Sequence, residues 1–114
     1  MIIMKTYRMY YERLVDLLVE ETEFSKDEIM TSKEEDCVNV RIMMVYLMSE
    51  AGVTDKNIEK LTGFTQQMIS RNKNQFSRRF EQSQTVRILT KITRKYITSC
   101  ITDFRNEQSQ VTLT

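Results

Sequence analysis

The sequence contains no histidine, proline or tryptophan, and only two glycines and two cysteines occur among its 114 residues. Without histidine, the chain lacks the most common general base and a frequent zinc ligand. Cys37 and Cys100 have no second ligand pair, so neither a zinc module nor a disulfide framework is predicted, and we expect both to be buried. Gly52 and Gly63 are too few for a glycine-rich phosphate loop. We therefore predict that the protein is not an enzyme and holds no metal or cofactor.

Long apolar segments are also absent. No run approaches the roughly 20 apolar residues that a membrane-spanning helix needs. Residues 1–11 have a short apolar start, but no apolar region followed by a small-residue cleavage site, so a secretory signal is not predicted. The hydrophobic fraction of 40% and the charged fraction of 29% are typical of globular proteins. We expect one cytoplasmic domain over residues 1–106, a frayed polar tail over residues 107–114, and no membrane association.

The net charge of +1 conceals two halves of opposite sign. Residues 1–51 carry six Lys or Arg and eleven Asp or Glu residues, which gives −5. Residues 52–114 carry eleven and five, which gives +6. This asymmetry indicates a polyanionic partner for the basic half, although a run of charge is more often only a solvated face.

The scarcity of helix breakers, together with recurring Leu, Met, Glu, Lys, Arg and Gln, predicts an all-α fold. We expect a compact bundle of about five helices. An amphipathic helix is predicted over residues 6–23, and a short second helix or turn begins with the capping-box pair Ser25 and Glu28. A third, mostly apolar helix follows the acidic residues 34–36 and ends near Gly52.

Met43, Met44 and Met48 lie in this third helix and permit two interpretations. A helix that is apolar on most sides is typical of a buried central element, in which methionine fills the core. Methionine also occurs in adaptable docking surfaces. The first interpretation is favoured, and the second offers one route to a protein partner.

Residues 54–71 predict two short helices joined by a tight turn. Thr54 can cap the first helix, Gly63 tolerates a positive φ, and Thr65 can cap the second helix. Ile58 and Ile69 provide buried positions. Two short helices joined by a glycine-containing turn form a helix-turn-helix unit.

The run from Thr62 to Arg71 (TGFTQQMISR) resembles the turn and recognition helix of bacterial repressors. In those proteins a glycine, a hydroxyl cap, two polar residues, a buried aliphatic residue and Ser-Arg follow one another in this order. The direct matches are Gly63, Thr65, Ile69, Ser70 and Arg71. Glu59 stands where the repressors usually have a small residue, and Asn72 stands where they usually have an aliphatic one.

A wider resemblance covers about residues 10–100. The run from Arg41 to Leu47 is similar to the arginine, apolar run and Tyr-Leu that precede the helix-turn-helix in the C-terminal DNA-binding domain of the bacterial replication initiator DnaA, a Trp-repressor-like fold. This resemblance implies the fold and double-stranded DNA as the partner. The family's Asp-His pair would fall near Thr65 and Gln66 and is missing, as is the ATPase domain. The resemblance therefore implies neither the initiator's target sequence nor its role in opening an origin.

The side chains around the motif divide into a cationic set and an apolar set, which suits a helix that lies in the major groove. We predict that Gln66, Gln67 and Arg71 contact base edges. We predict that the phosphates are contacted by Thr65, Ser70, Lys73, Arg78 and Arg79. The alternative is a helical hairpin that packs only against its own core.

Residues 84–106 predict a long final helix, which at about 1.5 Å per residue spans roughly 34 Å. Its main apolar stripe contains Val86, Leu89, Ile92 or Thr93, Tyr96, Cys100 and Phe104. A second apolar edge contains Ile88, Ile97 and Ile101. This edge can pack on a second copy, which gives a homodimer, or it can widen one face that packs on the protein's own core.

Together these features predict a DNA-binding helix-turn-helix protein that acts by occupying its site, as a transcriptional regulator or a replication accessory. The alternative is a non-enzymatic helical adaptor that binds a protein partner through its methionine-rich or C-terminal helix. In that case the basic half is only solvated surface.

Overall fold

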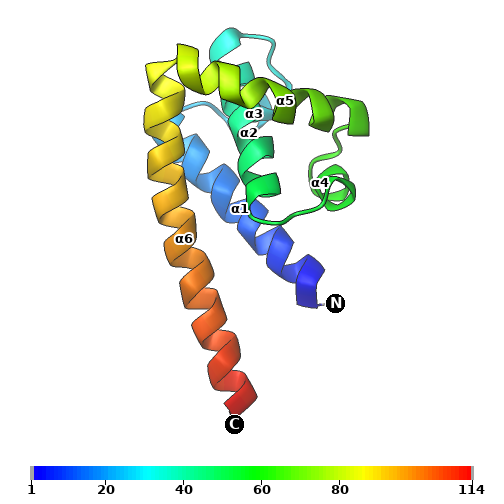
Figure 1. Cartoon of the computed structure of the whole chain (residues 1–114), viewed down its shortest axis with the longest axis vertical. Coiled ribbons are helices and arrows are strands. Elements are labelled where there is room, and N and C mark those ends of the chain that lie inside the picture. The colour runs from blue at the N-terminus through cyan, green and yellow to red at the C-terminus, as the bar shows by residue number, and fades with distance from the viewer. Residues whose placement is uncertain (1, 114) are drawn as a thin grey trace.

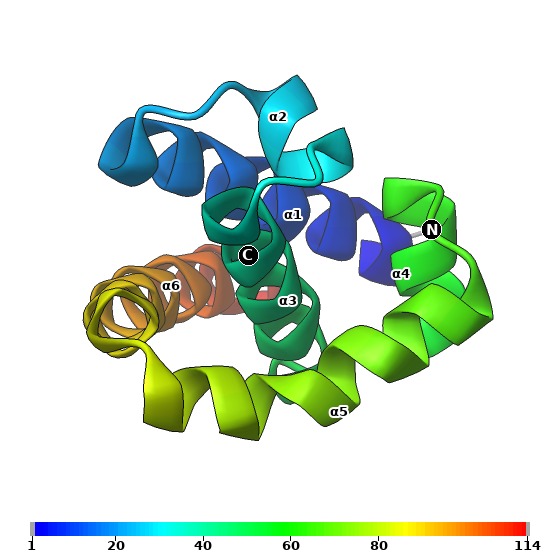
Figure 2. The ribbon, with the colours of Figure 1, turned by 90° about the horizontal axis from the view of Figure 1, so that it is seen from above.

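The computed structural model describes the backbone of residues 2–113 and the side chains of residues 4–98. Within this part of the chain the fold is all-α, as predicted. Its helices are α1 (Ile2–Thr22), α2 (Lys26–Thr31), α3 (Glu35–Glu50), α4 (Asp55–Thr62), α5 (Gln66–Gln82) and α6 (Gln84–Leu113). Figure 1 and Figure 2 show α3 at the centre of the bundle, where it contacts each of the other helices and packs most extensively against α5.

Most helix boundaries follow the local signals in the sequence. The capping box is present, because the backbone N–H of Glu28 donates to Ser25 Oγ at 3.1 Å and the Glu28 carboxylate accepts from the Ser25 N–H at 3.1 Å. Two ends differ from expectation. Helix α1 begins at Ile2 instead of near residue 6, and α6 continues through Leu113, beyond the predicted end at residue 106. Neither stretch contains a proline or glycine that would stop a helix.

The core confirms one interpretation of the methionine-rich helix and excludes the other. Met43, Met44 and Met48 are all 0% exposed, so they fill the centre of the bundle and cannot form a docking surface. Cys37, on the same helix, is also buried, as expected. Cys100 lies outside the described side chains.

Arg41 is a charged residue inside this core. Its Nε donates to the Ile29 carbonyl at 2.8 Å, and its Nη2 donates to the Ser32 carbonyl at 2.6 Å. These carbonyls lie at the C-terminal end of α2, where the helix dipole favours a cation. Burial lowers the pKa of Arg41 because it disfavours the charged form. The arginine that carries part of the resemblance to the DnaA domain therefore fastens α2 to α3.

Helix α6 presents a different face to the core from the one predicted. Its buried positions are Val86, Leu89, Thr90, Thr93 and Ile97. Its exposed hydrophobic side chains are Ile88, Ile92 and Tyr96, at 50%, 39% and 44% exposure. We predicted that Tyr96 belongs to the packed stripe and Ile97 to an outer edge, and both predictions are wrong. The buried positions follow a three- and four-residue spacing from Val86 through Thr93, and the next position in that series is Ile97. Cys100, Ile101 and Phe104 lie outside the described side chains.

Two contacts at the C-terminal end of α3 hold the flanking helices. The Tyr10 hydroxyl of α1 donates to the Leu47 carbonyl at 3.1 Å. The Arg94 guanidinium of α6 donates to both carboxylate oxygens of Glu50, at 3.0 and 2.7 Å. The hydrogen bond with Glu50 raises the pKa of Arg94. Burial raises the pKa of the Tyr10 hydroxyl, and the charge of Glu50 adds to this effect.

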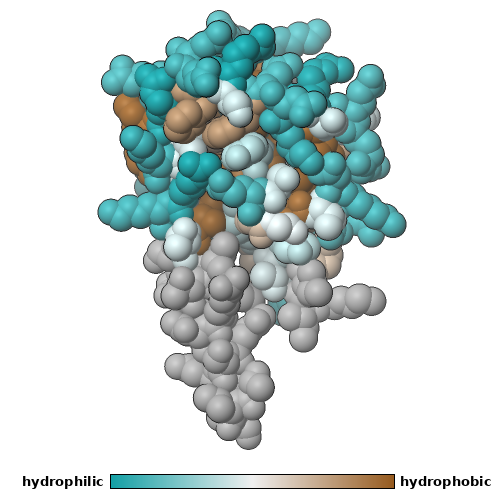
Figure 3. All heavy atoms as spheres, viewed as in Figure 1, coloured by the Kyte–Doolittle hydropathy of each residue, from teal (hydrophilic) through white to brown (hydrophobic). Residues whose placement is uncertain are grey.

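In the face seen in Figure 3, hydrophilic side chains cover most of the coloured surface and hydrophobic patches lie between them. Among the described residues, no helix combines the length and apolar character needed to cross a bilayer.

Candidate nucleic-acid interface

Residues 54–82 form two helices, α4 and α5, joined by a turn that carries the glycine and the two caps predicted for residues 54–71. The Thr54 hydroxyl accepts the Asn57 N–H at 3.3 Å and so caps α4, and the Thr65 hydroxyl accepts the Met68 N–H at 3.1 Å and caps α5. Gly63 ends α4 at φ +79°, a conformation that other residues rarely adopt. Phe64, which follows in the turn, is 8% exposed and anchors the turn in the core.

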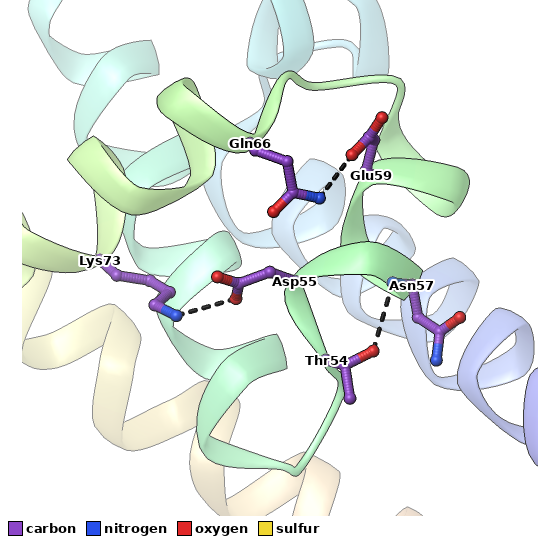
Figure 4. Close-up of polar contacts among 6 residues, drawn as sticks. All are labelled: Thr54, Asp55, Asn57, Glu59, Gln66 and Lys73. Atoms are coloured by element: carbon purple, nitrogen blue, oxygen red, sulfur yellow. Dashed lines mark hydrogen bonds and ion pairs between the residues drawn. The ribbon is translucent and has the colours of Figure 1, made fainter.

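Two polar contacts fix α4 against α5 (Figure 4). The Lys73 ammonium lies 2.8 Å from a carboxylate oxygen of Asp55, which links the first turn of α4 to the middle of α5. At the opposite end of the pair, the Gln66 side-chain amide donates to the Glu59 carboxylate. Glu59, which replaces the small residue of the repressor motif, therefore ties α4 to the start of α5.

The inner side of α5 packs on α3. Ile69 is fully buried, and the Phe76 ring stacks on the Tyr46 ring with centroids 3.9 Å apart and an interplanar angle of 3°. Asn72, which stands where repressors usually have an aliphatic residue, is buried at 7% exposure. Its Nδ2 has no hydrogen-bond partner within the described part of the chain, so it adds burial without a compensating bond.

The outer side of α5 carries only polar and charged side chains over its first four turns. Its exposed residues are Gln66, Gln67, Ser70, Arg71, Asn74, Ser77 and Arg78. Positions 67, 71, 74 and 78 follow one another at three- and four-residue spacing, so they form one continuous face of the helix. All of these side chains can donate hydrogen bonds, and two of them are cationic.

The structure divides the predicted base-contacting residues into two groups. Gln67 and Arg71 are exposed on the outer face of α5. Gln66 is also exposed, but its amide is engaged by Glu59. One of its two N–H donors is thus used within the protein, and its carbonyl oxygen remains available as an acceptor.

The predicted phosphate-contacting residues divide in the same way. Ser70 and Arg78 lie on the outer face. Thr65 is exposed, with its hydroxyl accepting the capping bond. Lys73 is paired with Asp55, and Arg79 turns back toward α3, where its Nη1 donates to Asn39 Oδ1 at 3.0 Å. The structure therefore does not place Lys73 and Arg79 beside the other cations of the outer face.

Sequence reasoning missed two residues of this face. Asn74 lies three positions after Arg71 and Ser77 lies one before Arg78, and both are exposed. Asn74 was predictable, because the four- and three-residue spacing of a helical face leads from Gln67 through Arg71 to position 74. On the neighbouring helix α4, Lys56 and Lys60 are exposed at i, i+4 spacing and so share one face of that helix.

Acidic residues around α2 lie away from α5, although Glu35 and Glu50 of the same half pair with Arg79 and Arg94. Figure 2 shows α2 and α5 on opposite sides of α3. The exposed acidic residues Asp27 and Glu28 lie on α2, and Glu34 directly precedes α3. The outer face of α5 is thus turned away from the acidic α2, which reduces the repulsion that a polyanion on α5 would meet.

No family model, no curated protein and no solved structure matches the chain.

Proposed function

We propose that the protein binds double-stranded DNA by placing the outer face of α5 in the major groove. The observation that supports this proposal is the polar face formed by Gln67, Arg71, Asn74 and Arg78 on a helix that packs against α3 and α4. Such a face can donate to base edges and phosphates while the helix keeps its orientation. The resemblance to repressor and DnaA-type helix-turn-helix domains supports the same function.

In this proposal the protein acts in the cytoplasm by occupying its site, as a transcriptional regulator or a replication accessory, without a catalytic step. Gln67 and Arg71 contact base edges, with Gln66 presenting its carbonyl oxygen beside them. Glutamine suits adenine and arginine suits guanine. Ser70, Arg78 and the Thr65 end of α5 contact phosphates, and Lys56 and Lys60 of α4 neutralise further phosphates.

Selection from a random duplex pool, followed by competition binding, tests this function. The affinity should fall with salt at a log–log slope of about −3 to −4, because each cation that neutralises a phosphate contributes about 0.9 to the slope. The four exposed cations of α4 and α5 are Lys56, Lys60, Arg71 and Arg78. Arg71→Ala should cost about 1–3 kcal/mol on the selected duplex and relax its sequence preference. The control Arg13→Ala removes an exposed arginine of α1 and should change neither the affinity for the selected duplex nor the sequence preference.

Two results would contradict the proposal. A flat salt response would mean that phosphates are not contacted. Equal losses on selected and scrambled duplexes for Arg71→Ala, with the circular dichroism spectrum unchanged, would mean that Arg71 contacts only the backbone.

A protein partner on α6 is the second candidate, and the exposed side chains Ile88, Ile92 and Tyr96 favour it. They follow one another at four-residue spacing and so form one apolar stripe. The stripe suits either a homodimer or another helical partner. The methionine-rich route of the adaptor hypothesis is excluded because those side chains are buried.

A further inference from the structure

A cavity of about 260 Å³ lies where three helices meet. Its walls come from the C-terminal end of α1, the N-terminal half of α3 and the first turns of α6. Ser83, the residue between α5 and α6, also lines it. The volume lies just below the 300–1,000 Å³ range of typical ligand sites, so it suits a compact molecule.

The lining has an apolar floor and a polar, acidic rim. The floor is formed by Phe24, Val40, Met43, Val86 and Leu89. The rim contains Glu21 and Asp36, both of which are exposed. Among the residues that the structure describes, no lysine or arginine lines the cavity. A bound anion would meet two like charges, and the nearby Arg79 is already paired with Asn39 and Glu35, whereas an ammonium group would meet two carboxylates beside an apolar surface.

The same cavity is connected to the C-terminal end of α5 through two residues. Asn39 lines the cavity, and its Oδ1 accepts the hydrogen bond from Arg79 of α5. Ser83 caps the C-terminal end of α5, with its backbone N–H donating to the Arg79 carbonyl at 2.9 Å. A molecule in the cavity would therefore touch the groups that set the position of the end of α5 relative to α3 and α6.

We propose that this cavity binds a small protonated amine with an apolar body, and that its occupancy alters the affinity of α5 for DNA. The ligand places its apolar body on the floor and its ammonium between Glu21 and Asp36. The amine site does not depend on the proposed function, whereas the effect of the amine on DNA affinity rests on the proposed function.

The binding test uses 2-phenylethylammonium, with the isosteric neutral alcohol 2-phenylethanol as the matched probe. Titration followed by ¹H–¹⁵N NMR should shift the amide signals of Thr22, Asn39 and Ser83. The alcohol should bind about tenfold more weakly. The double variant Glu21→Gln, Asp36→Asn should weaken binding of the amine about tenfold and leave binding of the alcohol unchanged.

The control Glu12→Gln removes an exposed α1 carboxylate that does not line the cavity, and it should bind the amine like the unsubstituted protein. Equal binding of the two probes, equal binding by the double variant, or shifts confined to residues outside the cavity would overturn the proposed site.

The second measurement is DNA affinity with and without saturating amine, on the duplex selected above. We expect at least a threefold change that disappears in the Glu21→Gln, Asp36→Asn variant. Binding of the amine with an unchanged DNA affinity would overturn the coupling and leave the site. An amine site in a protein that binds no duplex at any salt concentration would instead refute the proposed function.

Discussion

Arg78 and Arg79 are adjacent in sequence, but their environments predict opposite consequences of substitution. Arg78 is exposed on the outer face of α5. The Arg79 side chain is only 21% exposed, and its Nη1 lies 3.0 Å from Asn39 Oδ1 and 3.4 Å from a Glu35 carboxylate oxygen. Because successive residues of a helix are rotated by about 100°, one arginine faces solvent while the other packs against α3.

The stability effects follow from these contacts. Arg79→Ala removes a hydrogen bond from a charged donor, which contributes about 1.5–3 kcal/mol. The ion pair with Glu35, whose side chain is 81% exposed, adds about 0–1 kcal/mol. The buried Arg79 Nε has no partner within the described residues, and relief of that burial offsets part of the loss. We expect a net loss of about 1–2 kcal/mol for Arg79→Ala and a change within about 0.5 kcal/mol for Arg78→Ala.

For DNA binding, Arg78→Ala should have the larger effect and Arg79→Ala the smaller one. Removing one phosphate contact reduces the log–log salt slope by about 0.9. The affinity lost in Arg78→Ala should therefore be about 3.5-fold larger at 0.05 M than at 0.2 M salt, since that ratio is the fourfold salt change raised to the power of about 0.9. Arg78→Lys keeps the charge and should keep the slope. Arg79→Ala should leave the slope unchanged.

Urea unfolding followed by circular dichroism measures the stability of the two variants. Fluorescence anisotropy of a labelled duplex at several salt concentrations measures their DNA affinity. An Arg79→Ala protein with unchanged stability and a slope reduced by about 0.9 would contradict the placement of Arg79 against α3. It would mean that Arg79 leaves Asn39 to contact DNA.

Three further predictions concern the fold and its assembly. Phe76→Ala removes a ring stacked on Tyr46 and should lower the free energy of unfolding by about 3–5 kcal/mol in urea titrations, and a loss below about 1 kcal/mol would contradict the packing described. The raised pKa of Tyr10 means that the folded state holds this proton more tightly, so its stabilising effect is complete below about pH 10 and is lost as the pH rises further. Tyr10→Phe should cost about 1 kcal/mol at pH 7 and lose less stability between pH 10 and 11, whereas an identical alkaline profile would exclude Tyr10 as the titrating group. If α6 pairs with a second copy, light scattering at tens of micromolar should give twice the 13.6 kDa monomer mass, and Ile92→Glu should restore the monomer; a monomer without the substitution would rule out this dimer.

The caps and the turn that join α4 to α5 could be predicted from the sequence. Thr54, Gly63 and Thr65 act on backbone groups within four residues of themselves, so their effect does not depend on the rest of the fold. The same holds for the Ser25 capping box and for the all-α composition. The core position of the methionines also followed from a helix that is apolar on most sides.

The availability of each cation was decided by tertiary structure. Lys73 meets Asp55 at a separation of 18 residues, and Arg79 meets Asn39 at a separation of 40, so local pattern could not distinguish them from Arg71 and Arg78. The inward face of α6 was misassigned for a related reason. Two faces of comparable hydrophobicity compete for one core, and only the crossing of α6 over α3 and α1 selects the face that contains Ile97 and leaves Ile92 exposed. Caps and turns are set by neighbouring residues, whereas the choice of buried face and of ion-pair partner depends on helices that meet only after the chain has folded.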